Sequence, residues 1–207
     1  MTDIHFKINT KNQKLHVFLQ NNIRSFYDSL ESYKPNNLLF NILDKGTEKT
    51  FTDIFQDAIK QNNTYQEIKT FQQLRFEKEN NTYGFIDLIV ELNKKTLFII
   101  EAKSYWASQY EPTHESWLED KTDEFYKKTL SQAESYFHHD QDFYANYKSI
   151  YGIALVFTRT NIYNPIKVGN IWDFEHCSMD EFYAFKKFNF TNSNIGFAVY
   201  GKFKIIR

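Results

Sequence analysis

The sequence predicts an α/β (α+β) fold in which a mixed central sheet is flanked by helices in the order α-β-β-β-α-β. Two observations predict it. Apolar residues recur at helical spacing on either side of a block of strand-like runs, and only short polar breaks separate those runs. An N-terminal helix is expected before this core. The 207 residues fit a single domain, with the core at about 47–158 and a C-terminal extension at about 159–207.

Two amphipathic helices are expected before the sheet. Residues 15–33 carry apolar side chains at helical spacing, and the helix should end near Pro35. The second helix should begin after Gly46, with Thr47 as its N-cap, and end near residues 62–63. Its core-facing stripe comprises Phe51, Ile54, Phe55, Ala58 and Ile59.

The sheet begins with strand-like runs at 71–77, 83–92 and 96–103, which indicate an antiparallel meander. A helix over 122–138 and a strongly apolar strand over 151–158 complete the core. In the C-terminal extension, we expect a short helix near 179–187 and a final strand over 195–206.

Composition narrows the possible partners and compartments. Lys and Arg total 25 against 26 Asp and Glu, a net charge of -1, so any contact with nucleic acid must be a local patch. The single cysteine, Cys177, cannot form an intramolecular disulfide, which fits a reducing cytoplasm. The N-terminus has no signal-peptide pattern, and no apolar run reaches membrane length. We therefore expect a cytoplasmic protein without membrane association.

Three charged residues interrupt strands that are otherwise apolar. Asp87 interrupts one run, and Glu101 and Lys103 interrupt the next. Such apolar strands are usually buried, and ionised groups there require partners to offset their desolvation. Strand alternation places Lys103 on the same face as Glu101, with Ala102 turned away.

The register of these two strands brings the acids together. A short loop at 93–95 would pair Leu92 with Thr96, and the same register sets Asp87 opposite Glu101. Directly opposed residues have Cβ atoms roughly 4.5 to 5.5 Å apart, which destabilises like charges unless a cation lies between them. The sequence therefore indicates a bound divalent metal.

A third acid comes from the second helix. Glu48 falls near the edge of its apolar stripe and is expected to face inward, whereas Asp53 and Asp57 point towards solvent. A simpler alternative has equal weight: a glutamate in a first helical turn interacts favourably with the helix dipole.

The pattern Asp87-x13-Glu101-Ala102-Lys103 on a hairpin, preceded by a helix that carries Glu48, resembles the core of the PD-(D/E)xK, or restriction-endonuclease-like, nucleases. Ile86 replaces the proline that usually precedes the aspartate. The later segment Gln132-Ala-Glu-Ser-Tyr136 resembles the Gln-xxx-Tyr element of the RecB-like branch. The resemblance covers about residues 47–157.

The resemblance implies a metal-dependent nuclease that hydrolyses phosphodiester bonds, with DNA as the expected substrate. Oxygen ligands without soft ones suit Mg²⁺ or Mn²⁺. Asp87, Glu101 and the Ala102 carbonyl would bind the metal, Glu48 would support it directly or through water, and Lys103 would orient or activate the attacking water. By the same resemblance, Gln132 would position a water or phosphate, and Tyr136 would contact the nucleic-acid backbone.

Two alternatives remain open. The chain could be a catalytically inactive nucleic-acid-binding or protein-interaction module on the same fold, or a different α/β domain in which Lys103 forms an internal salt bridge with Glu101 and Asp87. The sequence contains no Gly-x-Ser-x-Gly, phosphate-binding Gly-rich loop or His-Glu-x-x-His, which disfavours serine hydrolases, P-loop ATPases and zinc proteases.

Nucleases of this kind often cut both strands of a duplex, which a two-fold dimer does most simply. We therefore expect a homodimer. The contact would involve the aromatic helix at 181–185 and the strand at 196–206, whose competing role is to extend the sheet and cover an edge.

Overall fold

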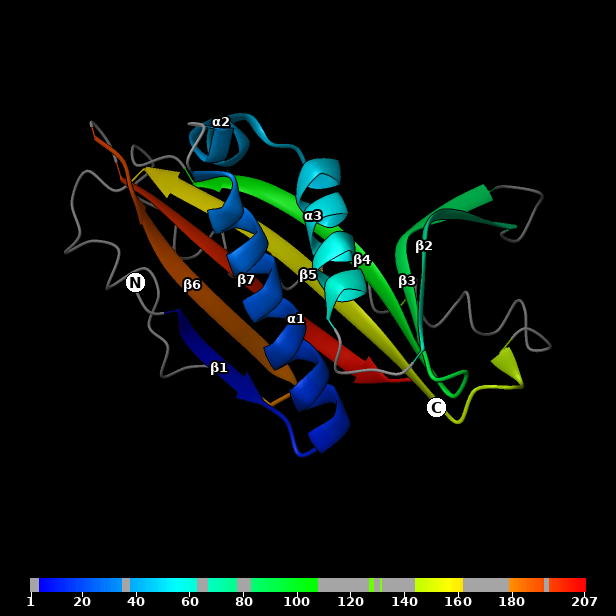
Figure 1. The fold of residues 1–207 in the computed structure, drawn as a ribbon. Coiled ribbons are helices and arrows are strands. Elements are labelled where there is room, and N and C mark those ends of the chain that lie inside the picture. Colours follow the sequence, from blue (N-terminus) through cyan, green and yellow to red (C-terminus); the bar gives the residue numbers. More distant parts are fainter. Residues whose placement is uncertain are drawn as a thin grey trace.

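The protein has a seven-stranded mixed sheet with three described helices, an α/β structure that agrees with the predicted class (Figure 1). The strand order is β1-β6-β7-β5-β4-β3-β2, in which β4 and β5 are parallel and all other neighbours are antiparallel. The strands are β1 (His5–Asn9), β2 (Ile68–Glu77), β3 (Tyr83–Leu92), β4 (Thr96–Ala107), β5 (Ser149–Asn161), β6 (Glu181–Asn189) and β7 (Asn194–Ile205). The computed structural model describes residues 4–34, 38–62, 67–77, 83–107, 127–128, 131, 144–161, 179–191 and 194–207.

The helices are α1 (Gln13–Ser32), α2 (Leu38–Lys45) and α3 (Glu48–Gln61). The two helices predicted before the sheet are confirmed as α1 and α3, and they lie over the same face of the sheet (Figure 1). Thr47 caps α3 in a reciprocal capping box with Thr50, as helix starts favour. The sequence did not predict α2. None of the described helices is long and apolar enough to cross a membrane.

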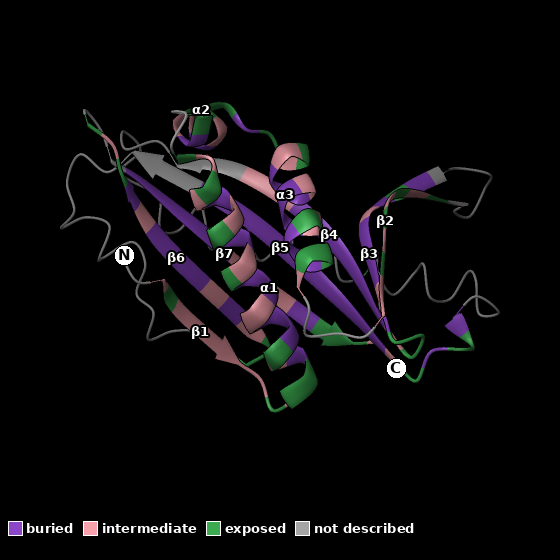
Figure 2. Cartoon of the chain, in the orientation of Figure 1, coloured by how far each residue is buried: buried purple, intermediate pink, exposed green. Residues whose placement is uncertain are grey.

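The main core lies between these helices and the sheet, where the inner strands are buried over most of their length, unlike the edge strands β1 and β2 (Figure 2). Aromatic side chains fill it: the rings of Phe18 and Phe98 stack with centroids 3.8 Å apart. The buried hydroxyl of Tyr27 donates to the carbonyls of Ala184 and Phe197 at 3.0 and 2.9 Å, so this large side chain leaves no polar group unsatisfied. The high aromatic content thus serves packing in this core.

The predicted meander is confirmed as β2, β3 and β4, and Leu92 pairs with Thr96 as expected. Asn93 and Lys94 make the turn with φ values of 51° and 54°. Left-handed residues are normal in such tight turns, and they close the loop without shifting the register. The apolar strand predicted to complete the core is confirmed as β5, and the predicted final strand as β7.

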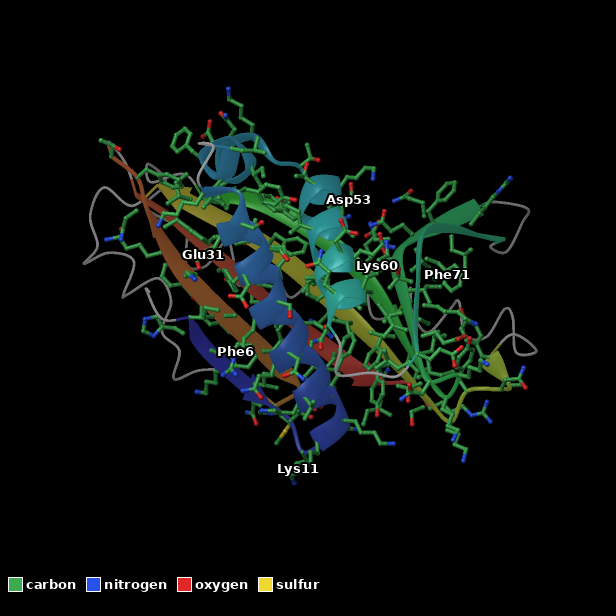
Figure 3. All side chains as sticks on the ribbon, viewed as in Figure 1. Phe6, Lys11, Glu31, Asp53, Lys60 and Phe71 are labelled. Carbon is green, nitrogen blue, oxygen red and sulfur yellow. The ribbon has the colours of Figure 1, made fainter. Side chains whose placement is uncertain are left out.

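The predicted helix at 179–187 is wrong, because this segment is the strand β6. Phe182 and Ala184 alternate into the core, and β6 pairs with β1 on one edge and β7 on the other. Lys186 is also buried, and its ammonium lies 2.9 Å from a Glu31 carboxylate oxygen on α1 (Figure 3 labels Glu31). The C-terminal extension therefore extends the sheet. The predicted helix at 122–138 lies outside the described residues except 127–128 and 131, which are helical.

Candidate functional site

The candidate site lies where β3 separates from β4. Their pairing runs from Leu92 and Thr96 to Leu88 and Ile100 and then stops. Asp87 and Glu101 are the next residues on the two strands. Beyond this point β4 still pairs with β5, whereas no strand among the described residues pairs with its other edge. The outer part of the β2–β3 pair turns away from β4 (Figure 1).

Carboxylates take the place of a strand at this open edge of β4. The backbone N–H of Ala102 donates to Asp87 Oδ2 at 2.8 Å. The backbone of Ser104 lies close enough to the Glu48 carboxylate to lower its pKa. In a strand, the N–H and C=O of one residue point to the same edge, so the Ala102 carbonyl is also directed here. The open edge therefore gathers two acidic side chains and a main-chain carbonyl.

Helix α3 brings Glu48 to this edge. Glu48 is the first residue of α3, immediately after the Thr47 cap, and both its carboxylate oxygens lie 3.2 Å from Lys103 Nζ. The two side chains are 35% and 42% exposed, so solvent partly screens this ion pair. The expectation that Glu48 faces inward is confirmed. Burial raises the pKa of Glu48, and the charge of Lys103 opposes that rise.

Glu101 is the most deeply buried acid of the site, with 6% of its surface exposed. Its Oε1 atom has no hydrogen-bond partner within the described residues. Burial, followed by the negative charge of Asp87 and a hydrogen bond shared with it, raises the pKa of Glu101 to about 9, while the charge of Lys103 lowers it. The two acids are thus adjacent, as expected, although the β3–β4 pairing ends one residue before them.

A metal ion at this site would be bound by side-chain carboxylates and a main-chain carbonyl together, and not by a cluster of three or more acids. Within the part of the chain that the structure describes, no three His, Cys, Asp or Glu side chains are arranged to hold a metal ion. Glu48 is engaged by Lys103, which leaves Asp87 and Glu101 as adjacent carboxylates beside the Ala102 carbonyl. Gln132 and Tyr136, the other predicted site residues, lie outside the described residues.

Sequence reasoning missed three features of the site. The Glu48–Lys103 ion pair joins α3 to β4, a contact between elements far apart in sequence. The position of the Ser104 N–H at the site could have been predicted, because it is the next backbone donor after Ala102 on the same edge of β4. Gln73, in the strand beside Asp87, has a left-handed backbone with φ of 52°, and nothing in the sequence signals it.

Comparisons with known proteins do not assign this site to a family. No protein-family model, curated protein or solved structure matches the chain. Any function must therefore be argued from the residues at the open edge of β4.

Proposed function

We propose that the chain is a divalent-metal-dependent nuclease with a restriction-endonuclease-like core, acting on phosphodiester bonds in DNA. The observation that carries the proposal is the meeting of Asp87, Glu101 and Lys103 at the open edge of β4. These are the residues whose spacing resembles the PD-(D/E)xK pattern. A buried acid, Glu101, beside the partly buried Asp87 is unfavourable without a compensating positive charge, and a cation supplies one.

The element order supports this core. Helix α3 is followed by the antiparallel strands β2, β3 and β4, then by helical residues at 127–128 and 131, and then by β5 parallel to β4. A parallel strand requires a crossover connection, most often a helix. The expected α-β-β-β-α-β sequence accounts for this arrangement, with α1 and α2 before it.

The oxygen donors at the site fit Mg²⁺ or Mn²⁺. Asp87, Glu101 and the Ala102 carbonyl would hold the ion, with Glu48 contributing directly or through water. Glu101 Oε1 lacks a hydrogen-bond partner among the described residues, which is what a carboxylate oxygen awaiting a cation would show. Mg²⁺ is commonly bound by one or two carboxylates and keeps several waters, so a third acidic ligand is unnecessary.

Each site residue has a defined role in the proposed reaction. A bound metal would polarise the phosphate and lower the pKa of its water. Lys103 holds a positive charge at the site and would orient the attacking water and stabilise negative charge in the transition state. Glu48 keeps the Lys103 ammonium in place through the 3.2 Å ion pair. Asp87, fixed by the Ala102 N–H, has its position set before substrate arrives.

A cleavage assay tests the proposal. Plasmid, linear duplex, single-stranded DNA and RNA would be incubated with Mg²⁺, Mn²⁺ or EDTA. We expect metal-dependent cleavage that Asp87→Ala, Glu101→Ala or Lys103→Ala removes. Asp53→Asn is the matched control, since this carboxylate lies on α3 but pairs with Lys49 away from the site (Figure 3). Activity that survives any two of the three site changes would overturn the mechanism.

One observation favours a second candidate, a catalytically inactive binding module on the same fold. Lys103 already pairs with Glu48, so this charge is balanced without a metal. An inactive module would show no cleavage in any metal. An intact metal site would still raise the melting temperature with millimolar Mn²⁺, whereas a purely internal charge network would be indifferent to it.

We further propose a cytoplasmic homodimer, with one site per chain. The dimer contact cannot use a strand edge of β6, because β1 and β7 occupy both edges, and β7 is likewise paired on both sides. Light scattering with and without duplex DNA tests the proposal. A mass of one chain under all conditions would indicate a monomer that nicks one strand or trims ends.

A further inference from the structure

One residue of the sheet has a backbone conformation that strands normally avoid. Among the described residues, four other than glycine have positive φ: Gln73, Asn93, Lys94 and Asp180. The last three lie in turns, where left-handed residues are expected. Gln73 lies instead in the middle of the strand β2, with φ of 52°. Such a conformation in a strand persists only where the surrounding structure holds it, and it often marks a functional constraint.

The irregularity falls opposite a site residue. β2 pairs with β3 through Gln72 and Leu88 on one side and Leu74 and Ile86 on the other, so no residue is inserted between these pairs. The pair missing from the register is Gln73 with Asp87. The interruption of β2–β3 pairing therefore coincides with the residue at which β3 also leaves β4.

Because β3 turns away from β4 at this point, a different atom accepts the hydrogen bond from the Ala102 N–H of β4. An antiparallel ladder continued past Leu88 and Ile100 would place Ile86 opposite Ala102, and the Ile86 carbonyl would accept the Ala102 N–H. In the structure, Asp87 Oδ2 accepts that hydrogen bond at 2.8 Å. If the Ile86 main chain lay opposite Ala102, it would displace the Asp87 carboxylate, and β3 would cover the Ala102 carbonyl.

We propose that Gln73 is a positioning residue of the site, whose left-handed backbone bends the β2–β3 pair away from β4 and thereby places the Asp87 carboxylate for the metal. The proposal rests on the proposed function. It assigns the role to the backbone of Gln73 rather than to its side chain. Residues that accept a left-handed backbone should preserve metal binding, and residues that resist it should weaken binding.

A substitution series on the full chain tests this role. Gly and Asn adopt a left-handed backbone readily, Ala less so, and β-branched Val least. We expect Gln73→Gly and Gln73→Asn to bind Mn²⁺ within about twofold of the wild type, and Gln73→Val to bind about tenfold or more weakly. Mn²⁺ affinity would be measured by calorimetry or electron paramagnetic resonance, without substrate. Phe71→Val is the matched control, because Phe71 lies two residues earlier in β2 and is 44% exposed (Figure 3).

Thermal unfolding in EDTA separates positioning from general damage. Val favours an extended strand, so Gln73→Val should unfold no lower than the wild type while its Mn²⁺ affinity falls. If Gln73→Val does not fold, Gln73→Ala replaces it, with the same ranking expected below Gly and Asn.

The outcomes that overturn the role are distinct. Wild-type Mn²⁺ affinity in the Val or Ala variant would show that other contacts place Asp87. Equal loss of affinity in Gln73→Gly and Gln73→Val would assign the effect to the side chain. A wild-type chain that binds no Mn²⁺ would overturn the proposed function itself, and this inference with it.

Discussion

Two glutamates with little exposed surface occupy opposite ends of the β3–β4 pair, and of these two only Glu91 forms an ion pair with a lysine among the described residues. Glu91 lies near the turn, where the Tyr147 hydroxyl donates to its Oε2 atom and Lys69 Nζ lies 3.4 Å from its Oε1 atom. Glu101 lies at the open end beside Asp87. The Oε1 atoms of both glutamates lack a hydrogen-bond partner within the described residues, but only that of Glu91 lies within ion-pair distance of a lysine there. The Glu91 side chain is 12% exposed and the Glu101 residue is 6% exposed, so both carboxylates have limited contact with solvent.

The difference separates a structural carboxylate from a candidate ligand. Glu91 has an ammonium and a phenol from its own chain, and burial, together with the Glu91 hydrogen bond and charge, raises the pKa of Tyr147 so that the phenol keeps its proton. Glu101 instead has a second acid as its neighbour. Its charge must be neutralised by a proton or by a cation from solution.

The largest expected effect is on cleavage. Glu101→Gln removes a charge of the proposed metal site at the open end, and we expect cleavage in Mg²⁺ to fall on the order of 100- to 1000-fold. Glu91→Gln, at the turn end, should leave the rate within about twofold, since Glu91 has no part in the site. Initial rates on the preferred substrate measure both. Equal losses in the two variants would break the comparison.

The next effect is a pH dependence of stability in EDTA. The folded-state pKa of Glu101 is raised to about 9 from an ordinary 4.5, so folding favours its protonated form. The stability that this group contributes is full below about pH 4.5 and is lost as pH rises towards 9. Glu101→Gln does not titrate and should therefore become more stable relative to the wild type as pH rises. Between pH 5 and 8 the gap should grow by on the order of 3 kcal/mol.

Urea unfolding in EDTA at pH 5, 6, 7 and 8 would measure this gap. Under the proposed function, Mn²⁺ should narrow it at high pH, because the ion would stabilise the ionised wild-type site and would be bound less well by the variant. A gap that stays constant with pH would mean that Glu101 ionises normally, and the contrast with Glu91 would then lose its electrostatic basis.

Much of the fold followed from local periodicity. The helices α1 and α3 and the strands β3, β4 and β5 have long, regular apolar patterns, and a short loop fixed the β3–β4 register. β6 was predicted wrongly because both its faces are buried in part, as Phe182 and Phe185 show. A continuous apolar run of this kind does not distinguish strand from helix. The edge strand β1 is five residues long and gives too short a pattern to predict.

The site was predictable to the extent that it follows from strand register. The adjacency of Asp87 and Glu101 required only the register and the alternation of side chains. The partner of Lys103 was not predictable, because Glu48 reaches it through the packing of α3 on the sheet. The bend at Gln73 was not predictable either, since glutamine has no preference for a left-handed backbone.

A smaller effect tests the compensated end. Tyr147→Phe removes the hydrogen bond to Glu91 Oε2 while keeping the ring in its cluster with Ile89 and Tyr144. We expect the free energy of unfolding to fall by about 1 to 3 kcal/mol, because a buried carboxylate loses a donor. Urea unfolding at pH 7 measures it, and cleavage should be unchanged. A neutral result would show that Lys69 alone compensates Glu91.

The smallest effect compares the two lysines that face these acids. Lys69 and Lys103 have side chains 49% and 42% exposed, and each forms an ion pair with a glutamate. Ion pairs that solvent reaches in this way contribute roughly 0.2 to 1 kcal/mol, so Lys69→Ala and Lys103→Ala should lower stability by similar, small amounts. Only Lys103→Ala should also remove cleavage, since its ammonium stands beside Glu101. Unfolding and cleavage measured on the same preparations test both statements. If Lys103→Ala lowered the free energy of unfolding far more than Lys69→Ala, the ion pair of Lys103 with Glu48 would be mainly structural. The charges at the open end of β4 would then have the same stabilising role as those around Glu91 at the turn.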